Sequence, residues 1–292
     1  MVQLNVSETT RASSAARVNR DDLECVKSQM GFARRSPDEN APEVFWSPTE
    51  KNPPPMVGYD VTIRNARPIV NELSLDREGF VLVKHKTSCA NERDPAIVTD
   101  KYLEEMVPFL KDYFHASWVV PKRVGTGVVV RSMEKVFSGV RNASGPGLAH
   151  IDYASIAAPL LAARDSQAQG IPLRSYSRLM IIHAWRVLSP PPHDLPLALC
   201  DRSSVLDTDI FEYDNINSVG ESFRGCALHF NPNHRWYYFP DLSRDELILF
   251  KSYDSKEGCN AQGAHTGFDN RRAYPNARPR ESIEARFFVY FA

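Results

Sequence analysis

The sequence has no excess of charge of either sign and no long hydrophobic run. Lysine and arginine total 35 while aspartate and glutamate total 36, which gives a net charge of −1 at pH 7. No basic block is present that could neutralise a row of phosphates. The longest apolar stretches, 179–185 and 287–291, have the length of buried strands and are far too short to span a membrane. We therefore expect neither nucleic acid nor a membrane as a partner.

Cysteine is scarce and irregularly placed. The five cysteines are odd in number, widely spaced and include no CxxC pair, which argues against a disulfide framework and against a zinc knuckle. The N-terminal residues are polar and lack the apolar core of a secretory signal. These features predict reduced thiols in a cytoplasmic protein whose residues 1–40 form a disordered or loosely packed tail.

The length of the chain and its composition predict one domain. A chain of 292 residues with 42% hydrophobic and 24% charged residues can bury a single large core. Residues 41–70 are rich in proline and predict an extended arm wrapped around that core. Apolar residues at helical spacing predict one helix over 100–115, capped by Asp100, and a second over 155–169. We expect a single domain over residues 41–292.

Short strands separated by glycine and proline turns dominate the C-terminal half. Strands are predicted over residues 79–84, 125–132, 178–187, 197–200, 225–230, 235–239, 246–253 and 282–291. Many short strands preceded by helices are typical of a mainly β fold with a helical N-terminal layer. The expected architecture is a double-stranded β-helix, which is the jelly roll of cupin-like proteins.

A histidine and an aspartate stand two residues apart in the segment AHIDY. On a strand His150 and Asp152 project from the same face, about 7 Å apart, while Ile151 faces away. An imidazole and a carboxylate on one face, joined by one more histidine, form the facial triad that leaves three coordination positions open on Fe(II). 2-Oxoglutarate takes two of these positions and O₂ takes the third. A surface strand could carry the same pair by chance.

The third ligand of such a triad has to come from a strand late in the roll. His265, in NAQGAHTGFDN, lies far enough along the chain for several strands to intervene. Small residues flank it, including Gly263 and Gly267, and these let the backbone approach a metal and a substrate closely. The alternative is a polar loop histidine that caps a turn.

Two arginines compete for the 2-oxoglutarate carboxylate. Arg280 and Ser282 open the last predicted strand on one face, where a guanidinium fork can hold a carboxylate through two hydrogen bonds and a hydroxyl can add another. Alternation places Arg286 on that same face, so it is a rival for this role. Arg280 could instead be a solvated charge beside Arg278. We favour Arg280.

Five sequence stretches carry a family resemblance. They are AHIDYAS, MIIHAWRVLSPPPHDLPLALCDRSSV, HRWYYFPDLSRDELILFKSYDS, GAHTGFDN and PRESIEARFFVYFA. They cover most of residues 145–292, and the earlier GYDVTIRNARPI and LDREGFVLVKHKT match the N-terminal part. On these stretches the chain resembles the fungal and bacterial family that includes the GA4 desaturase, the AsaB hydroxylase/desaturase and CmcJ. It departs from the family pattern at His183 and Val187, where members commonly have asparagine and proline.

The resemblance implies an Fe(II)- and 2-oxoglutarate-dependent oxygenase that acts on a small molecule of secondary metabolism by hydroxylation, desaturation or cyclisation. Fe(II), 2-oxoglutarate and O₂ are the implied cofactor and co-substrates. His150, Asp152 and His265 match the family's metal positions, and Arg280 with Ser282 resembles its co-substrate motif. One alternative is an inactive jelly-roll binding protein, and another is a cupin-like dioxygenase that does not use 2-oxoglutarate. A methyl-transfer role would need a glycine-rich nucleotide turn, which is absent.

Three further residues lie on predicted strands with one face toward the interior of the roll. Arg186 and Tyr238 are candidates to reach the co-substrate or a substrate carboxylate, although alternation lets only about half of such residues point inward. His183 lies on an apolar strand and is interpreted as a hydrogen-bonded core histidine rather than a fourth ligand. A homodimer is possible.

Overall fold

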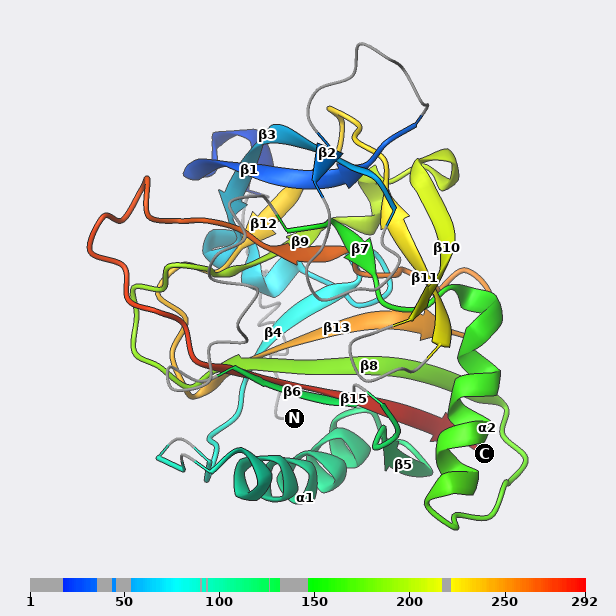
Figure 1. The fold of residues 1–292 in the computed structure, drawn as a ribbon. Coiled ribbons are helices and arrows are strands. Elements are labelled where there is room, and N and C mark those ends of the chain that lie inside the picture. The colour runs from blue at the N-terminus through cyan, green and yellow to red at the C-terminus, as the bar shows by residue number, and fades with distance from the viewer. Residues whose placement is uncertain are drawn as a thin grey trace, which may run out of the picture.

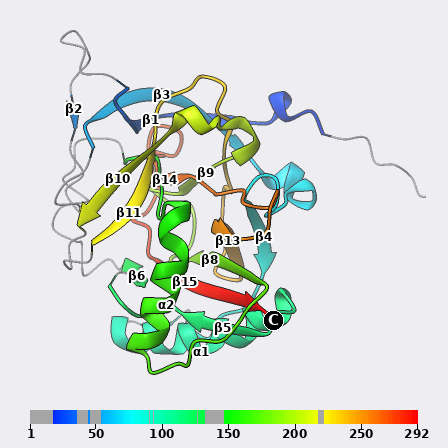
Figure 2. The ribbon, with the colours of Figure 1, turned by 90° about the vertical axis from the view of Figure 1, so that its right-hand side faces the viewer.

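Two β-sheets pack face to face and form the framework of the described part of the chain (Figure 1). The structure is a computed structural model, and it describes residues 18–35, 44–45, 54–89, 91–92, 94–125, 127–131, 147–216 and 222–292. The helix α1 covers the outer side of the lower sheet, and α2 runs along one end of the assembly (Figures 1 and 2). This is the mainly β architecture that the strand pattern predicts.

The six-stranded sheet is built around two long antiparallel partners. Its order is β4-β13-β8-β15-β5, with β6 also paired to β15. The strands are β4 Phe80–Lys84, β5 Trp118–Pro121, β6 Val128–Arg131, β8 Arg178–Val187, β13 Glu246–Asp254 and β15 Ser282–Phe291. β8 and β15 pair along their whole lengths, from Arg178 opposite Phe291 to Val187 opposite Ser282. Both strands have the bounds predicted from the sequence.

Helix α1, Pro95–Tyr113, packs on the outer face of the six-stranded sheet. Its buried residues recur at helical spacing and meet every second residue of β8 and β15. The helix begins earlier than expected, because the Asp94 side chain accepts hydrogen bonds from the backbone N–H groups of Ala96 and Ile97. Asp94 followed by Pro95 is a stronger start signal than Asp100, since proline fits the first helical position. The predicted start was therefore wrong by one turn and a half.

The nine-stranded sheet runs in the order β1-β3-β12-β9-β14-β7-β11-β10, with β2 paired to β3. Its strands are β1 Cys25–Ala33, β2 Val44–Phe45, β3 Met56–Asn65, β7 His150–Ile151, β9 Leu197–Cys200, β10 Ile210–Ile216, β11 Ser222–Leu228, β12 Trp236–Tyr238 and β14 His265–Gly267. The sheet curls until β1 returns beside the residues ahead of β7. There Gly31 accepts a hydrogen bond from the backbone of Ala149 and donates one to Gly147.

Strand β1 lies within the segment expected to be a loose tail. Cys25–Ala33 pairs with all of β3 except its residue Asn65, and its inward residues Met30 and Phe32 are fully buried. The alternation in CVKSQMGFA is too weak to predict a strand. The strand is stabilised instead by its pairing with β3 and by the packing of Met30 and Phe32. Residues 1–17, the start of the predicted tail, lie outside the described residues.

Apolar side chains from both sheets meet in the space between them. One cluster joins Trp185 and Phe250 of the six-stranded sheet to Leu199 and Tyr237 of the nine-stranded sheet. A second cluster, at the other end, joins Ile181 and Phe288 to residues of α2, Ala158–Ala168. Polar side chains lie between these two clusters, and they form the site described below. The short 3-10 helices are η1 Arg20–Asp22, η2 Arg67–Glu72, η3 Ser155–Ala157, η4 Arg202–Ser204 and η5 Asp207–Asp209.

No helix among the described residues is long and apolar enough to cross a membrane. All five cysteines are free thiols.

An ion pair fixes the start of β13 against η2. Arg67 donates two hydrogen bonds to Glu246, at 2.6 and 2.9 Å, and the backbone N–H of Ser243 donates a third. Burial alone would raise the pKa of Glu246, but these bonds lower it to about 2. Because the folded pKa is depressed, the stabilisation is complete above the ordinary pKa of a carboxyl group and is lost as the pH falls toward 2.

Glu246→Gln should lower the free energy of unfolding by roughly 1.5–3 kcal/mol at pH 7. Urea titrations of the variant and the wild type should converge between about pH 5 and about pH 2, where the wild type loses its advantage. Asp214→Asn is a matched control, because Asp214 pairs with Arg224 on the exposed surface, and this substitution should change the free energy of unfolding far less. A difference that is constant with pH would contradict the assignment.

Candidate metal centre

His150 and Asp152 lie on one side of the strand segment that carries them. His150 is in β7, and Asp152 follows directly after its end. Ile151 points the other way, into an apolar cluster behind the nine-stranded sheet. The alternation expected from AHIDY is therefore present, although β7 itself is only two residues long.

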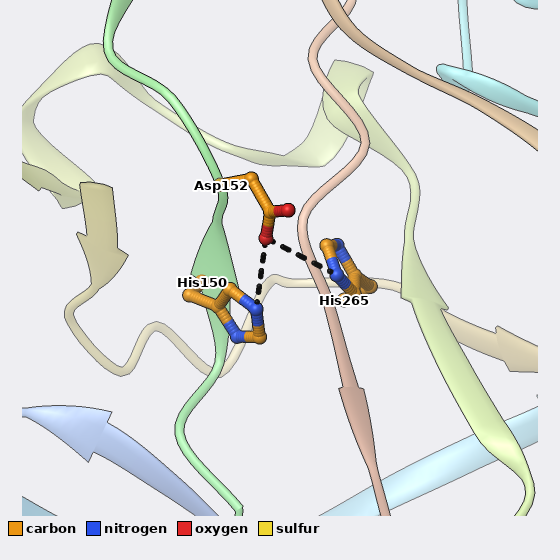
Figure 3. A group of neighbouring side chains, drawn as sticks. All are labelled: His150, Asp152 and His265. Atoms are coloured by element: carbon orange, nitrogen blue, oxygen red, sulfur yellow. Dashed lines mark ion pairs between the residues drawn. The ribbon is translucent and has the colours of Figure 1, made fainter. Parts of the chain in front are cut away.

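His265 reaches the same place from β14. In the antiparallel pairing of β14 with β7, His265 stands directly opposite His150, so both rings project from the same face. Their ring centroids are 4.4 Å apart. The Asp152 Oδ1 atom lies 3.2 Å from His150 Nε2 and 3.7 Å from His265 Nε2 (Figure 3). The structure thus brings together the three residues that the sequence predicts as a triad.

The second ring nitrogen of each histidine is held by the backbone. His150 Nδ1 lies 2.8 Å from the carbonyl oxygen of Leu148, and His265 Nδ1 lies 3.1 Å from that of Gly263. A carbonyl can only accept, so Nδ1–H donates in both rings and the Nε2 lone pairs are directed toward Asp152. Two such lone pairs and a carboxylate oxygen are the donor set that a divalent metal ion binds, and backbone bonds of this kind orient metal-ligating histidines.

Burial sets the charge of the group. Removal from water and the nearby His150 lower the pKa of His265 to about 3, so this ring is neutral at physiological pH. Burial alone would raise the pKa of Asp152, but the Arg286 guanidinium holds it well below its usual range. A neutral imidazole and an ionised carboxylate are the states in which these side chains bind metals. The residues therefore fit a divalent cation.

A second polar group faces the triad from the six-stranded sheet. Arg286 of β15 donates to Asp152 Oδ2 from Nε at 2.6 Å, and its Nη2 lies 3.1 Å from Glu284 Oε1. Glu284 in turn lies 2.8 Å from His183 Nδ1. His183 is fully buried and its other nitrogen is 2.7 Å from Ser252 Oγ. His183 is thus the hydrogen-bonded core histidine that the sequence predicts.

Glu284 was not among the predicted site residues. It lies between Ser282 and Arg286 on the same face of β15, so the alternation that pointed to Arg286 would also have found it. Burial alone would raise its pKa, but the charge of Arg286 and the hydrogen bond from His183 lower the pKa of Glu284 to about 2. The carboxylate is therefore a fixed negative charge that is only 14% exposed.

Arg280 is partly buried, stands two residues before Ser282, and contacts residues other than Asp152. Its guanidinium stacks over Trp185 at 5.3 Å, and its Nη1 donates to the backbone carbonyl of Leu195. Within the described part of the chain its buried Nε atom has no hydrogen-bond partner. Burial and the nearby charge of Arg131 lower the pKa of Arg280 to about 9, although Asp194 and Glu284 act in the opposite direction. A partly buried cation whose buried Nε has no partner among the described residues is suited to an anionic ligand.

Two predicted residues do not reach this site. Arg186 projects from the opposite face of β8, where it bonds to His85 and stacks on Tyr102 beneath α1. Tyr238 projects from the opposite face of β12 and packs edge-on against Phe268. In each case the neighbouring residue on the strand points inward instead, since alternate residues face opposite sides.

Comparison with known proteins adds independent evidence. A family model described as YDMC, an oxidoreductase/YMDC permease-like domain, matches residues 30–290. The hydroxylase/desaturase efuI of Hormonema carpetanum is 30% identical over 250 residues, which are 79% of this chain and 83% of that protein. The Fe(II)/2-oxoglutarate-dependent dioxygenase nvfI of Aspergillus novofumigatus is 26% identical over 242 residues, covering 80% and 83%. This chain belongs to the hydroxylase/desaturase family of Fe(II)/2-oxoglutarate oxygenases.

Membership of this oxygenase family confirms the resemblance inferred from the sequence, together with the enzyme class. Fe(II), 2-oxoglutarate and O₂, the expected cofactor and co-substrates, are those of this class. The fold is confirmed as well, because the solved structure of the endoperoxidase NvfI superposes with a TM-score of 0.70 at 22% identity. That match covers 92% of this chain and 98% of the other.

Proposed function

We propose that this oxygenase binds Fe(II) through His150 Nε2, Asp152 Oδ1 and His265 Nε2, and that it oxidises a small molecule of secondary metabolism. The main support for this proposal is that the Nε2 atoms of His150 and His265, both oriented by backbone hydrogen bonds, converge on one carboxylate oxygen of Asp152. The relatives efuI and nvfI, named as a hydroxylase/desaturase and an Fe(II)/2-oxoglutarate-dependent dioxygenase, support the reaction class. Hydroxylation, desaturation and cyclisation all begin with removal of one hydrogen from the substrate.

We assign the distal carboxylate of 2-oxoglutarate to Arg280 and Ser282. Arg280 offers an unused buried donor, whereas the guanidinium of Arg286 is already engaged by Asp152 and Glu284. Ser282 is buried on the inner face of β15 and can add a hydroxyl donor. The partners of the two arginines, rather than their positions along the strand, therefore support Arg280 over Arg286.

The residues of the chain position the reactants and exclude water. When bound, the iron supplies the activation of dioxygen coupled to conversion of 2-oxoglutarate into succinate and carbon dioxide. Phe250 forms a wall beside the triad, with its ring centroid 4.5 Å from that of His265. The His150 side chain is 31% exposed, whereas His265 and Asp152 are 5% and 10% exposed. Substrate would therefore approach along the His150 side, because the other two ligands are covered.

Anaerobic addition of Fe(II) and 2-oxoglutarate should give a visible metal-to-ligand charge-transfer band, since chelation requires the 2-oxo group and two adjacent open positions. Glutarate, which lacks the 2-oxo group, is the control and should give no band. Iron retention without a band would instead favour a cupin-like dioxygenase that does not use 2-oxoglutarate. Failure to retain iron would favour an inactive binding protein.

We propose a cytoplasmic location and a small-molecule substrate. A cytoplasmic protein is supported by the five free thiols, which persist in a reducing compartment. A small-molecule substrate is supported by the class of the relatives. A homodimer remains a prediction.

A further inference from the structure

The two oxygens of Asp152 face different partners. Oδ1 is directed at the two histidine nitrogens, at 3.2 and 3.7 Å. Oδ2 accepts a hydrogen bond from Arg286 Nε at 2.6 Å and lies 2.5 Å from Arg286 Nη2 in an ion pair. Both donors of one guanidinium edge therefore converge on the same oxygen, which occupies the lone pairs of Oδ2 and leaves Oδ1 as the oxygen presented to a metal ion.

Arg286 is itself held from behind. Its Nη2 lies 3.1 Å from Glu284 Oε1, and the same oxygen is 2.8 Å from His183 Nδ1. Ser252 closes the chain of contacts at 2.7 Å from His183 Nε2. These residues come from β15, β8 and β13, which are neighbouring strands of one sheet. The side chains of Glu284, Arg286 and His183 are 14%, 8% and 0% exposed.

The number of oxygens that Asp152 gives to the metal decides how many positions remain. With two histidines and one carboxylate oxygen, three of six positions stay open, enough for a chelating 2-oxo acid and for dioxygen. A carboxylate binding through both oxygens would take the third position. Retaining that position therefore depends on keeping Oδ2 away from the ion.

We infer that Arg286, clamped by Glu284 and His183, is a positioning residue that fixes Asp152 as a one-oxygen ligand and so keeps the dioxygen position open. This inference rests on the proposed function, since it assumes that the triad holds iron. This role of Arg286 is distinct from binding the co-substrate. Glu284 would hold the edge of the Arg286 guanidinium in place against Asp152 Oδ2.

The test uses nitric oxide as a probe for the dioxygen position in the anaerobic Fe(II)–2-oxoglutarate form of the full chain. Arg286→Met removes the donors while keeping a side chain of similar length. We expect this variant to form the charge-transfer band but to bind nitric oxide about tenfold or more weakly, as read from the electron paramagnetic resonance signal of the nitrosyl complex. Glu284→Gln should show a smaller loss in the same direction.

Two further variants separate positioning from folding. Arg286→Lys keeps the charge without the fork, and it should recover part of the nitric oxide binding while still falling below the wild type. Arg271→Met is the matched control, because Arg271 pairs with Asp269 on the exposed surface and should behave as the wild type.

The outcomes distinguish this inference from the proposed function. Absence of a charge-transfer band in the wild type would sink the proposed function and this inference with it. A wild-type band together with unchanged nitric oxide affinity in Arg286→Met would overturn only the positioning role. If Arg286→Met does not fold, Arg286→Lys decides: full wild-type affinity for nitric oxide would refute the need for the fork.

Discussion

His150→Ala should reduce succinate formation by more than about two orders of magnitude. Loss of a residue that merely orients a metal ligand costs about 10- to 100-fold in metal affinity or activity, so loss of a ligand should cost more. His150 is the most exposed member of the triad, with 31% of its side chain accessible, and its removal should leave the fold intact. The measurement is succinate released per enzyme in the presence of Fe(II), 2-oxoglutarate and O₂.

A second readout of the same variant does not depend on turnover. A metal that binds only the folded state raises the unfolding free energy by about 2.7 kcal/mol at one hundred times its dissociation constant. Anaerobic Fe(II) should therefore raise the melting temperature of the wild type and leave that of His150→Ala unchanged. His115→Asn is the control, because His115 is exposed and lies at a positive φ that asparagine tolerates. Undiminished metal stabilisation in His150→Ala would remove this residue from the centre.

Arg280→Ala should weaken 2-oxoglutarate binding by roughly 10- to 100-fold, which corresponds to the 1.5–3 kcal/mol of a hydrogen bond to a charged group. Iron affinity should not change, because Arg280 lies beside Trp185 and Leu195 rather than at Asp152. The dissociation constant is read from the titration of the charge-transfer band with 2-oxoglutarate.

Arg278→Ala serves as the comparison for that experiment. Arg278 is exposed and two residues away, so its removal should leave the titration unchanged. The competing assignment makes the opposite prediction: if Arg286 held the co-substrate, Arg280→Ala would titrate like the wild type and Arg286→Met would lose the band. The two arginines are thereby separated by one measurement on two variants.

The long strands were predictable because each carries its own signal. β8 and β15 are ten-residue apolar stretches with clear ends, and both have the predicted bounds. The strands that carry His150 and His265 are two and three residues long, which is too short for any local pattern. The sequence nevertheless predicts His150, Asp152 and His265 as a group, and the structure brings them together, because the choice rests on their residue types and spacing rather than on secondary structure.

Other features depend on contacts between distant residues. β1 is a strand because β3 lies beside it, and nothing in residues 25–33 alone requires this. For Arg186 and Tyr238 the sequence did not determine which face of the strand points inward. A shift of one position exchanges the two faces of a strand. Glu284 was overlooked although the register set by Ser282 and Arg286 already placed it. A charged residue on a predicted inner face is therefore a signal in its own right.

The bridge between Gly31 and the residues just ahead of His150 has a consequence for biosynthesis. Strand β1 leaves the ribosome early but has to wait for Gly147 and Ala149 before this edge can close. His265 and Arg286 are synthesised later still. Because every one of these pairings is remote along the chain, the proposed ligand set cannot come together before His265 has been synthesised. At the proposed centre, metal binding would therefore follow the synthesis of that residue.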